Sequence, residues 1–285
     1  MKMGFRRTLF LCHIILINLV SLTVAQPNFL SHFCNHNDST SAYQTNRDTL
    51  LSTLAEKTDQ YGFYTSSTGE NPDTVYALVL CRADAKLDVC RECINNSTAK
   101  LKELCPDGKE AIGWYDDCML RYTNKSVKGI MEAEPSYPVW NVNKNVTSVE
   151  QFKDALEKLL ESLGDKAASG GSLRKFASGN TTGPDSQTIY ALAQCTPDIS
   201  EQNCSDCIRG AFNTTNFENC CAGPAGGRII RPSCHFRFEL GPFVGEIPEV
   251  PVGAPSGCRG LKGRCASVAA VLLNFIGLAL LLSIC

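Results

Sequence analysis

The 285-residue sequence lacks the short motifs that mark common catalytic centres. It contains no Gly-x-Ser-x-Gly nucleophile motif, no His-Glu-x-x-His zinc motif and no glycine-rich phosphate loop. It also lacks a charge excess, because the formal net charge is only −2. A nucleic-acid-binding face requires clustered lysine and arginine side chains. These absences argue against an enzyme and against a nucleic-acid partner, and we expect neither a cofactor nor a metal.

Two local features resemble catalytic groups, and neither forms a recognisable site. Asp116 and Asp117 are adjacent carboxylates, and adjacent residues on a strand point to opposite faces. We therefore expect a solvated surface here and not an acid–base pair. His235 follows a cysteine and has no visible partner in the sequence, while Gly223–Gly227 lies between cysteines and is typical of a turn.

Cysteine, in contrast, is abundant, with sixteen residues that cluster along the chain. Such a content indicates metal sites in a reducing compartment and disulfides in an oxidising one. The N-terminus favours the oxidising compartment. A basic start precedes the apolar run Leu9–Val24, and the small residues Thr23 and Ala25 suit a cleavage site. We expect a signal peptide over residues 1–25 and a secreted mature chain.

Glycosylation motifs support secretion. The Asn-x-Ser/Thr pattern occurs eight times, which makes a glycosylated surface a reasonable expectation. The acceptor residues are Asn37, Asn95, Asn96, Asn124, Asn145, Asn180, Asn203 and Asn213.

The C-terminus ends in the apolar segment Ala266–Cys285. Three basic residues precede it on the side that would face outward, which is opposite to the usual charge bias of a membrane helix. Small residues, a polar spacer and an apolar tail instead suit a glycolipid-anchor signal. We expect attachment at Ser256 and removal of residues 258–285, and the alternative is a membrane span without a tail.

The remaining cysteines reveal an internal duplication. Cys81, Cys90 and Cys93 recur 114 residues later, so both copies contain C-x8-C-x2-C. Tyr-Ala-Leu precedes the first of these cysteines in each copy. A repeat of this length indicates duplicated domains and not a solenoid. We expect domains at 26–131 and 147–242, a linker at 132–146 and a Pro/Gly-rich stalk at 243–257.

Each copy shows the same order of predicted elements. An amphipathic helix comes first, around Leu50–Leu54 in one copy and Phe152–Leu163 in the other. Ser148 with Gln151 predicts a capping box at the start of the second of these helices. An extended pair, a helix carrying C-x2-C and two short strands follow. The order favours an α+β fold with an antiparallel sheet.

The C-x2-C pair has three interpretations. Zinc could take two such pairs, and a redox centre would need a thioredoxin-like unit. On a helix, however, Cys90 and Cys93 share one face and can reach two different strands. Together with the secretory signal, this favours structural disulfides.

These motifs, with a closing Cys-x-x-Arg-Tyr/Phe, resemble the plant cysteine-rich repeat secretory proteins, which carry two ginkbilobin-like (salt-stress response/antifungal) domains. That family is related to plasmodesmata-located proteins and to the ectodomains of cysteine-rich receptor-like kinases. The resemblance covers about residues 30–240. It implies two tandem disulfide-stapled domains, each a small antiparallel sheet packed with two helices.

The family pairing pattern is first with fifth, second with third and fourth with sixth cysteine. It implies five bridges here: Cys34–Cys105, Cys81–Cys90, Cys93–Cys118, Cys195–Cys204 and Cys207–Cys234. The second copy has Trp140-Asn141 roughly where Cys34-Asn35 stood, so Cys220 and Cys221 are left over. They either bridge each other or take part in a different pairing.

The resemblance also implies a mannose site made of an Asn, an Arg and a Glu. The second copy supplies Arg228 and Glu239, with Asn141 as a loose match. The first copy keeps Asn35 but has Ile112 and Thr123 at the other two positions. Amide, guanidinium and carboxylate groups can hold sugar hydroxyls. The alternative is that Arg228 and Glu239 form a structural ion pair.

We therefore expect an extracellular, lipid-anchored protein on the outer face of the cell membrane that binds mannose-like glycans or receptor partners. Roles in plant defence, stress signalling or communication at plasmodesmata follow from the resemblance. The alternative is a released mannose-binding antifungal effector.

Overall fold

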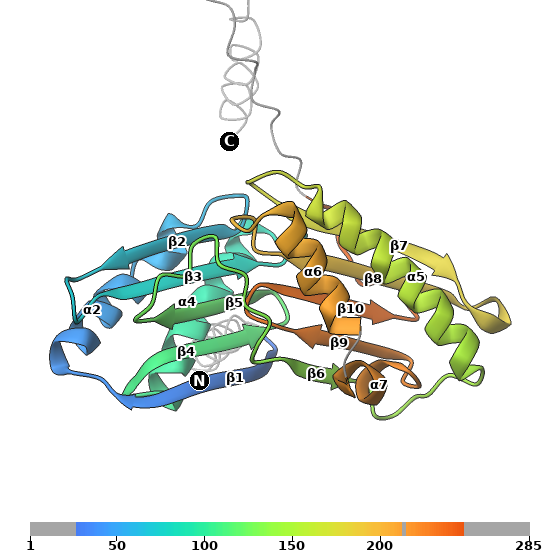
Figure 1. The fold of residues 1–285 in the computed structure, drawn as a ribbon, viewed down its shortest axis with the longest axis horizontal. Helices are drawn as coiled ribbons and strands as arrows, with labels where there is room; N and C mark the ends of the chain where they lie inside the picture. The colour runs from blue at the N-terminus through green and yellow to red at the C-terminus, as the bar shows by residue number, and fades with distance from the viewer. Residues whose placement is uncertain (1–26, 213–214, 248–285) are drawn as a thin grey trace, which may run out of the picture. The chain divides into compact units, whose positions relative to one another are not determined.

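The computed structural model describes residues 27–212 and 215–247, which carry two sheets with their helices (Figure 1). The first domain contains β1 (Phe29–Asp38), α2 (Ser41–Leu51), α3 (Leu54–Lys57), β2 (Phe63–Thr68), β3 (Val75–Cys81), α4 (Leu87–Leu104), β4 (Gly108–Tyr115) and β5 (Cys118–Thr123). The second contains β6 (Tyr137–Trp140), α5 (Val149–Ala168), β7 (Lys175–Thr182), η1 (Pro184–Ser186), β8 (Thr188–Cys195), α6 (Glu201–Phe212), α7 (Thr215–Cys221), β9 (Gly226–Ile230) and β10 (Cys234–Glu239).

Each sheet has five antiparallel strands, and the two sheets share one topology. Sheet A has the order β1-β4-β5-β3-β2, and sheet B has the equivalent order β6-β9-β10-β8-β7. The predicted α+β class and tandem arrangement are thereby confirmed. Each domain nevertheless begins with a strand that the sequence did not predict, because β1 and β6 precede the first helix of their domain.

The expected linker at 132–146 contains one of these strands. β6 pairs with β9, from Tyr137 opposite Ile230 to Trp140 opposite Gly227. Pro138 is tolerated in β6 because the strand lies at a sheet edge, where a proline need not donate a backbone hydrogen bond to a second neighbour. The segment is therefore partly a structural strand of the second domain.

The amphipathic pattern of the second domain forms α5 as predicted. Phe152, Leu156, Leu160 and Leu163 recur every three or four residues and are all buried. Ser148 stands at the N-cap, but its side chain makes no capping hydrogen bond, so the predicted capping box is wrong. Its backbone is not extended there, which moves the hydroxyl away from the helix amides.

Five disulfides join the pairs that the family resemblance implies: Cys34–Cys105, Cys81–Cys90, Cys93–Cys118, Cys195–Cys204 and Cys207–Cys234. The two cysteines left over, Cys220 and Cys221, bridge each other, which is the first of the two alternatives. Cys90 and Cys93 lie on α4 and reach the end of β3 and the start of β5. The C-x2-C motif thus fastens one helix face to two strands.

The apolar core has three parts. One cluster lies between sheet A and its helices, and another lies between sheet B and its helices. The third forms at the junction of the two domains, where Ile230 of β9 joins residues of the first domain. Its first-domain members are Leu78, Leu80, Ile112, Trp114, Met119 and Val127. The outer faces of the sheets, away from the helices, therefore contribute to one shared interface.

Several sequence-based expectations lie outside the described residues. They include the signal peptide at 1–25, the attachment site Ser256, the tail at 258–285 and the acceptor Asn213. Over 27–212 and 215–247, no helix is both long and apolar enough to cross a membrane.

Candidate functional site at the domain junction

A charged cluster lies where the two domains meet, and its centre is Asp116. Asp116 and Asp117 form the bend between β4 and β5 and do not lie within a strand. Because a bend does not alternate its side chains, both carboxylates approach the same Arg82 guanidinium, at 3.5 and 3.6 Å. The prediction of a solvated face is therefore wrong for Asp116, whose side chain is only 21% exposed.

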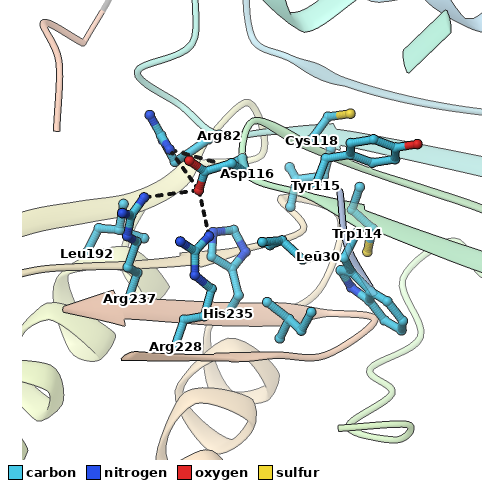
Figure 2. Close-up of a pocket in the computed structure, with 13 residues that line it drawn as sticks. Leu30, Arg82, Trp114, Tyr115, Asp116, Cys118, Leu192, Arg228, His235 and Arg237 are labelled. Carbon is cyan, nitrogen blue, oxygen red and sulfur yellow. Dashed lines mark hydrogen bonds and ion pairs between the residues drawn. The ribbon is translucent and has the colours of Figure 1, made fainter. Parts of the chain in front are cut away.

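Three guanidinium groups converge on Asp116 (Figure 2). Arg228 Nη1 donates to Asp116 Oδ1 at 2.6 Å, and Arg237 Nη1 donates to the same oxygen at 3.0 Å. Arg82 comes from the first domain, whereas Arg228 and Arg237 come from the paired strands β9 and β10 of the second. We call these four residues, with the neighbouring His235, the Asp116 cluster. One carboxylate of the first domain thus forms ion pairs with two arginines of the second domain.

The chain after β10 returns to this cluster. The Phe243 ring lies 4.4 Å from the Arg237 guanidinium, a cation–π distance. The Gly245 amide donates to Asp84 Oδ2 at 2.8 Å, and Asp84 also accepts from Arg82 Nε at 2.6 Å. The first residues of the expected stalk at 243–257 are therefore packed against both domains.

The pKa values of the two aspartates are shifted in opposite directions. Burial alone would raise the pKa of Asp116, but the guanidinium groups, Arg228 foremost, hold it below its ordinary value. Burial raises the pKa of Asp117. Arg82 acts against that rise, while the charges of Asp116 and Asp84 add to it. Of these two carboxyls, Asp116 therefore stays ionised to the lower pH.

His235 faces a cavity of about 30 Å³ beside the same charges. Burial, followed by the positive charges of Arg228 and Arg82, lowers the pKa of His235 to about 4. A space of about 10–15 Å³ suffices for one water molecule, so the cavity has room for ordered water but not for bulk solvent. Sequence reasoning singled out His235 but found no partner for it, because His235 gains its surroundings only when β10 faces the first domain.

Polar contacts beyond the cluster also join the domains. Gln194 Nε2 donates to the Cys81 carbonyl at 2.9 Å, and Gln194 Oε1 accepts from the Ala83 amide at 3.3 Å. Trp114 Nε1 donates to the Arg231 carbonyl at 3.4 Å. The junction therefore combines ion pairs, hydrogen bonds and an apolar cluster.

The predicted sugar-binding residues are divided between the two sheets. Asn35 lies on β1 opposite Glu110, in the first domain. Arg228 and Glu239 both lie in sheet B, but Arg228 pairs with Asp116 and Glu239 pairs with Arg237 at 3.0 Å. Within the described residues, Arg228 and Glu239 therefore form ion pairs with other residues and not with each other.

Glu239 and Tyr190 form a cross-strand pair on the outer face of sheet B, and the backbone of Asn141, directly after β6, joins the same row. Glu239 lies opposite Tyr190 on one side and Gly226 on the other, and the Asn141 amide donates to the Gly226 carbonyl at 2.9 Å. Residues opposite each other in register point to the same face. A side chain at Gly226 would collide with the Glu239 carboxylate, so only glycine provides the space that this carboxylate occupies. Tyr190, which sequence reasoning missed, adds a half-buried aromatic ring.

The glycosylation motifs differ in their exposure. Asn95, Asn124, Asn145 and Asn180 are exposed, while Asn96 and Asn203 are half-buried. The side chain of Asn37 lies outside the described residues.

For metals, the described stretches contain no group of three His, Cys, Asp or Glu side chains that could hold an ion.

Similarity to known proteins follows the duplicated cysteine framework. The family model described as "Salt stress response/antifungal" matches residues 33–125 and 140–241. Cysteine-rich repeat secretory protein 38 of Arabidopsis thaliana is 36% identical, over 78% of this chain and 89% of that protein. Antimicrobial ginkbilobin-2-like protein of Castanea crenata is also 36% identical, over 80% of this chain and 93% of that protein.

A longer relative is cysteine-rich receptor-like protein kinase 25 of Arabidopsis thaliana, which is 36% identical over 90% of this chain. The chain spans only 38% of that kinase.

Two solved structures share the fold. The tandem DUF26 ectodomain of the Arabidopsis thaliana cysteine-rich receptor-like protein PDLP8 has a TM-score of 0.63 at 22% identity, covering 74% of this chain and 98% of that ectodomain. The PDLP5 ectodomain has a TM-score of 0.60 at 25% identity, covering 77% and 100%. Two family matches, two equivalent sheets and one cysteine framework agree: the chain belongs to the salt stress response/antifungal family, as a tandem pair of its domains.

Proposed function

We propose that the protein is an extracellular recognition module that binds a glycan on the outer face of sheet B. The observation that carries the proposal is the row formed by Asn141, Glu239 and Tyr190 across the strands of one face. Its secretory and ectodomain relatives support an extracellular place of action. Recognition rather than catalysis fits a cluster whose charged groups are held in mutual ion pairs.

The row has the chemistry that sugars require. A carboxylate and an amide accept and donate hydrogen bonds to neighbouring hydroxyls, and a tyrosine offers both a ring and a hydroxyl. Arg228 has a different role in this proposal. The Arg228 side chain is only 15% exposed and pairs with Asp116, so Arg228 supports the domain junction and does not contact the sugar. Glu239 also pairs with Arg237, but through Oε1 alone, and its side chain is 28% exposed.

The test is a glycan array with the mature secreted protein, followed by titration with a mannose oligosaccharide. We expect Glu239→Gln, Asn141→Ala and Tyr190→Ala each to weaken binding at least tenfold, because each removes one contact of the row. Asp154→Asn on the exposed side of α5 is the matched control and should bind normally. Full binding by all three variants would refute a site on this face.

The Castanea relative favours a second role, because its name describes an antimicrobial protein and the match covers 93% of it. A membrane-anchored receptor partner and a released antimicrobial effector differ in their location. Glycolipid anchoring predicts release from membranes by a phosphatidylinositol-specific phospholipase. An effector predicts that the free protein inhibits fungal growth. Release by the phospholipase would favour a role in stress signalling or plasmodesmal communication. Inhibition of fungal growth would favour a role in defence.

A further inference from the structure

We propose that the Asp116 cluster is a latch between the two domains, closed at neutral pH and released in acid. The cluster joins the domains through one shared carboxylate oxygen, Asp116 Oδ1, which accepts from both Arg228 and Arg237. Arg82 approaches the same oxygen from the first domain. The three cations lie close together only because this carboxylate lies between them.

His235 is placed to oppose that arrangement once it is charged. The groups that face its ring are Arg228 on β9, Arg82 and Asp84 after β3 and Asp116 in the β4–β5 bend. Arg237 lies two residues further along the same strand, and the neutral Gln194 lies opposite on β8. A proton on His235 would therefore add a fourth positive charge at the junction, in a cavity too small to dilute it with bulk water.

The direction of the effect follows from the environment of the ring. The closed junction lowers the pKa of His235 from 6.5 to about 4, so the closed state favours the neutral ring. An opened junction would hydrate the ring and restore its ordinary pKa. The contribution of His235 to closure is therefore fully present above pH 6.5 and is progressively lost as the pH falls toward 4.

The two aspartates contribute with opposite signs. The lowered pKa of Asp116 means that the closed state favours its ionised form, so this contribution to closure is kept down to pH 3.8 and is lost only below it. The raised pKa of Asp117 means that the closed state favours its protonated form, so Asp117 opposes the release. Asp117→Asn, which resembles the protonated form, should therefore favour the closed junction.

The chain offers its own reporter for this motion. It contains two tryptophans, and Trp114 lies in the junction at 3% exposure, whereas Trp140 is 41% exposed. The mature protein with Trp140→Phe therefore reports the junction through the fluorescence of Trp114 alone. Far-UV circular dichroism on the same samples separates opening of the junction from unfolding of the disulfide-stapled domains.

We expect the Trp114 emission to shift to longer wavelength between pH 6.5 and pH 4 with unchanged circular dichroism. His235→Asn and His235→Gln, which cannot be protonated, should remove most of this shift. Asp116→Asn should give the shifted emission already at pH 7.5, and Asp117→Asn should move the midpoint to lower pH. An emission that stays constant down to pH 4, or a full acid shift in both His235 variants, would overturn the latch.

Discussion

The two domains have one topology but are held together by different means. In the first, Cys34–Cys105 spans 71 residues and fastens the edge strand β1 to the end of α4. In the second, the corresponding strand β6 has only four residues and carries no cysteine. There an aromatic group fills the core, since Phe236 lies 5.4 Å from Phe212 and 6.1 Å from Phe217. A covalent staple and a larger apolar core are thus alternative solutions for the same fold.

Equivalent arginines show a similar divergence. Arg121 and Arg237 each stand three residues after the last bridged cysteine of their copy. Arg121 pairs with Glu110 of its own sheet and with Glu132, whereas Arg237 pairs with Asp116 of the other domain and with Glu239. Duplication kept the cation on the outer face of the sheet, and the surroundings decided its partners.

Removing the long staple should have the largest effect on this comparison. We expect Cys34→Ser with Cys105→Ser to lower the free energy of unfolding by about 4 kcal/mol, because the unfolded chain regains the entropy of a long loop. Hydrogen exchange resolved by peptide should locate the loss in α4 and sheet A. Equal loss of protection in α5 and α6 would show that the two domains unfold as one unit.

Removing the aromatic centre of the second domain should come next. Phe236→Ala should cost about 3–4 kcal/mol, because the ring is fully buried among two other phenylalanines. Leu120→Ala, the equivalent buried position of the first domain, is the matched control and should cost about 2–3 kcal/mol. Urea unfolding measures both, and a larger loss for Leu120→Ala would contradict the view that aromatic packing compensates for the missing bridge.

The smallest effect is expected at a repeat-equivalent pair of the junction. Leu80 and Gln194 are 114 residues apart, and Gln194 makes the two hydrogen bonds that join the domains. Gln194→Leu places the residue of the first domain at the equivalent position of the second. It should lower the free energy of unfolding by about 1 kcal/mol, because two backbone groups lose their hydrogen-bond partner. Thermal unfolding checks this value, and an unchanged midpoint would mean that water replaces the amide without loss.

Local patterns predicted the elements whose packing is local. The spacing of Phe152, Leu156 and Leu160 predicted α5, and the C-x2-C motif predicted a helix that reaches two strands. The strands β1 and β6 were missed because an edge strand is defined by its hydrogen-bonded neighbour, and the segment that contains β6 was assigned to a linker. The capping prediction at Ser148 failed because a cap depends on backbone angles that residue types alone do not set.

In the candidate site, too, local sequence predicted residues but not their distant partners. Arg228, Glu239 and Asn141 were found by resemblance, but their partners were not. Asp116 was expected in solvent, yet it accepts hydrogen bonds from arginines 112 and 121 residues away. No periodicity within a copy contains that information, because each partner lies in the other copy.

By itself, the amino-acid sequence determined the duplication, the cysteine framework and the α+β class, since spacing along the chain and apolar periodicity are properties of one segment at a time. Only the tertiary structure decided which carboxylate became the centre of the domain junction, and that Arg228 faces Asp116 and not Glu239. Such ion pairs depend on how two folded surfaces meet, and burial at that meeting sets their strength.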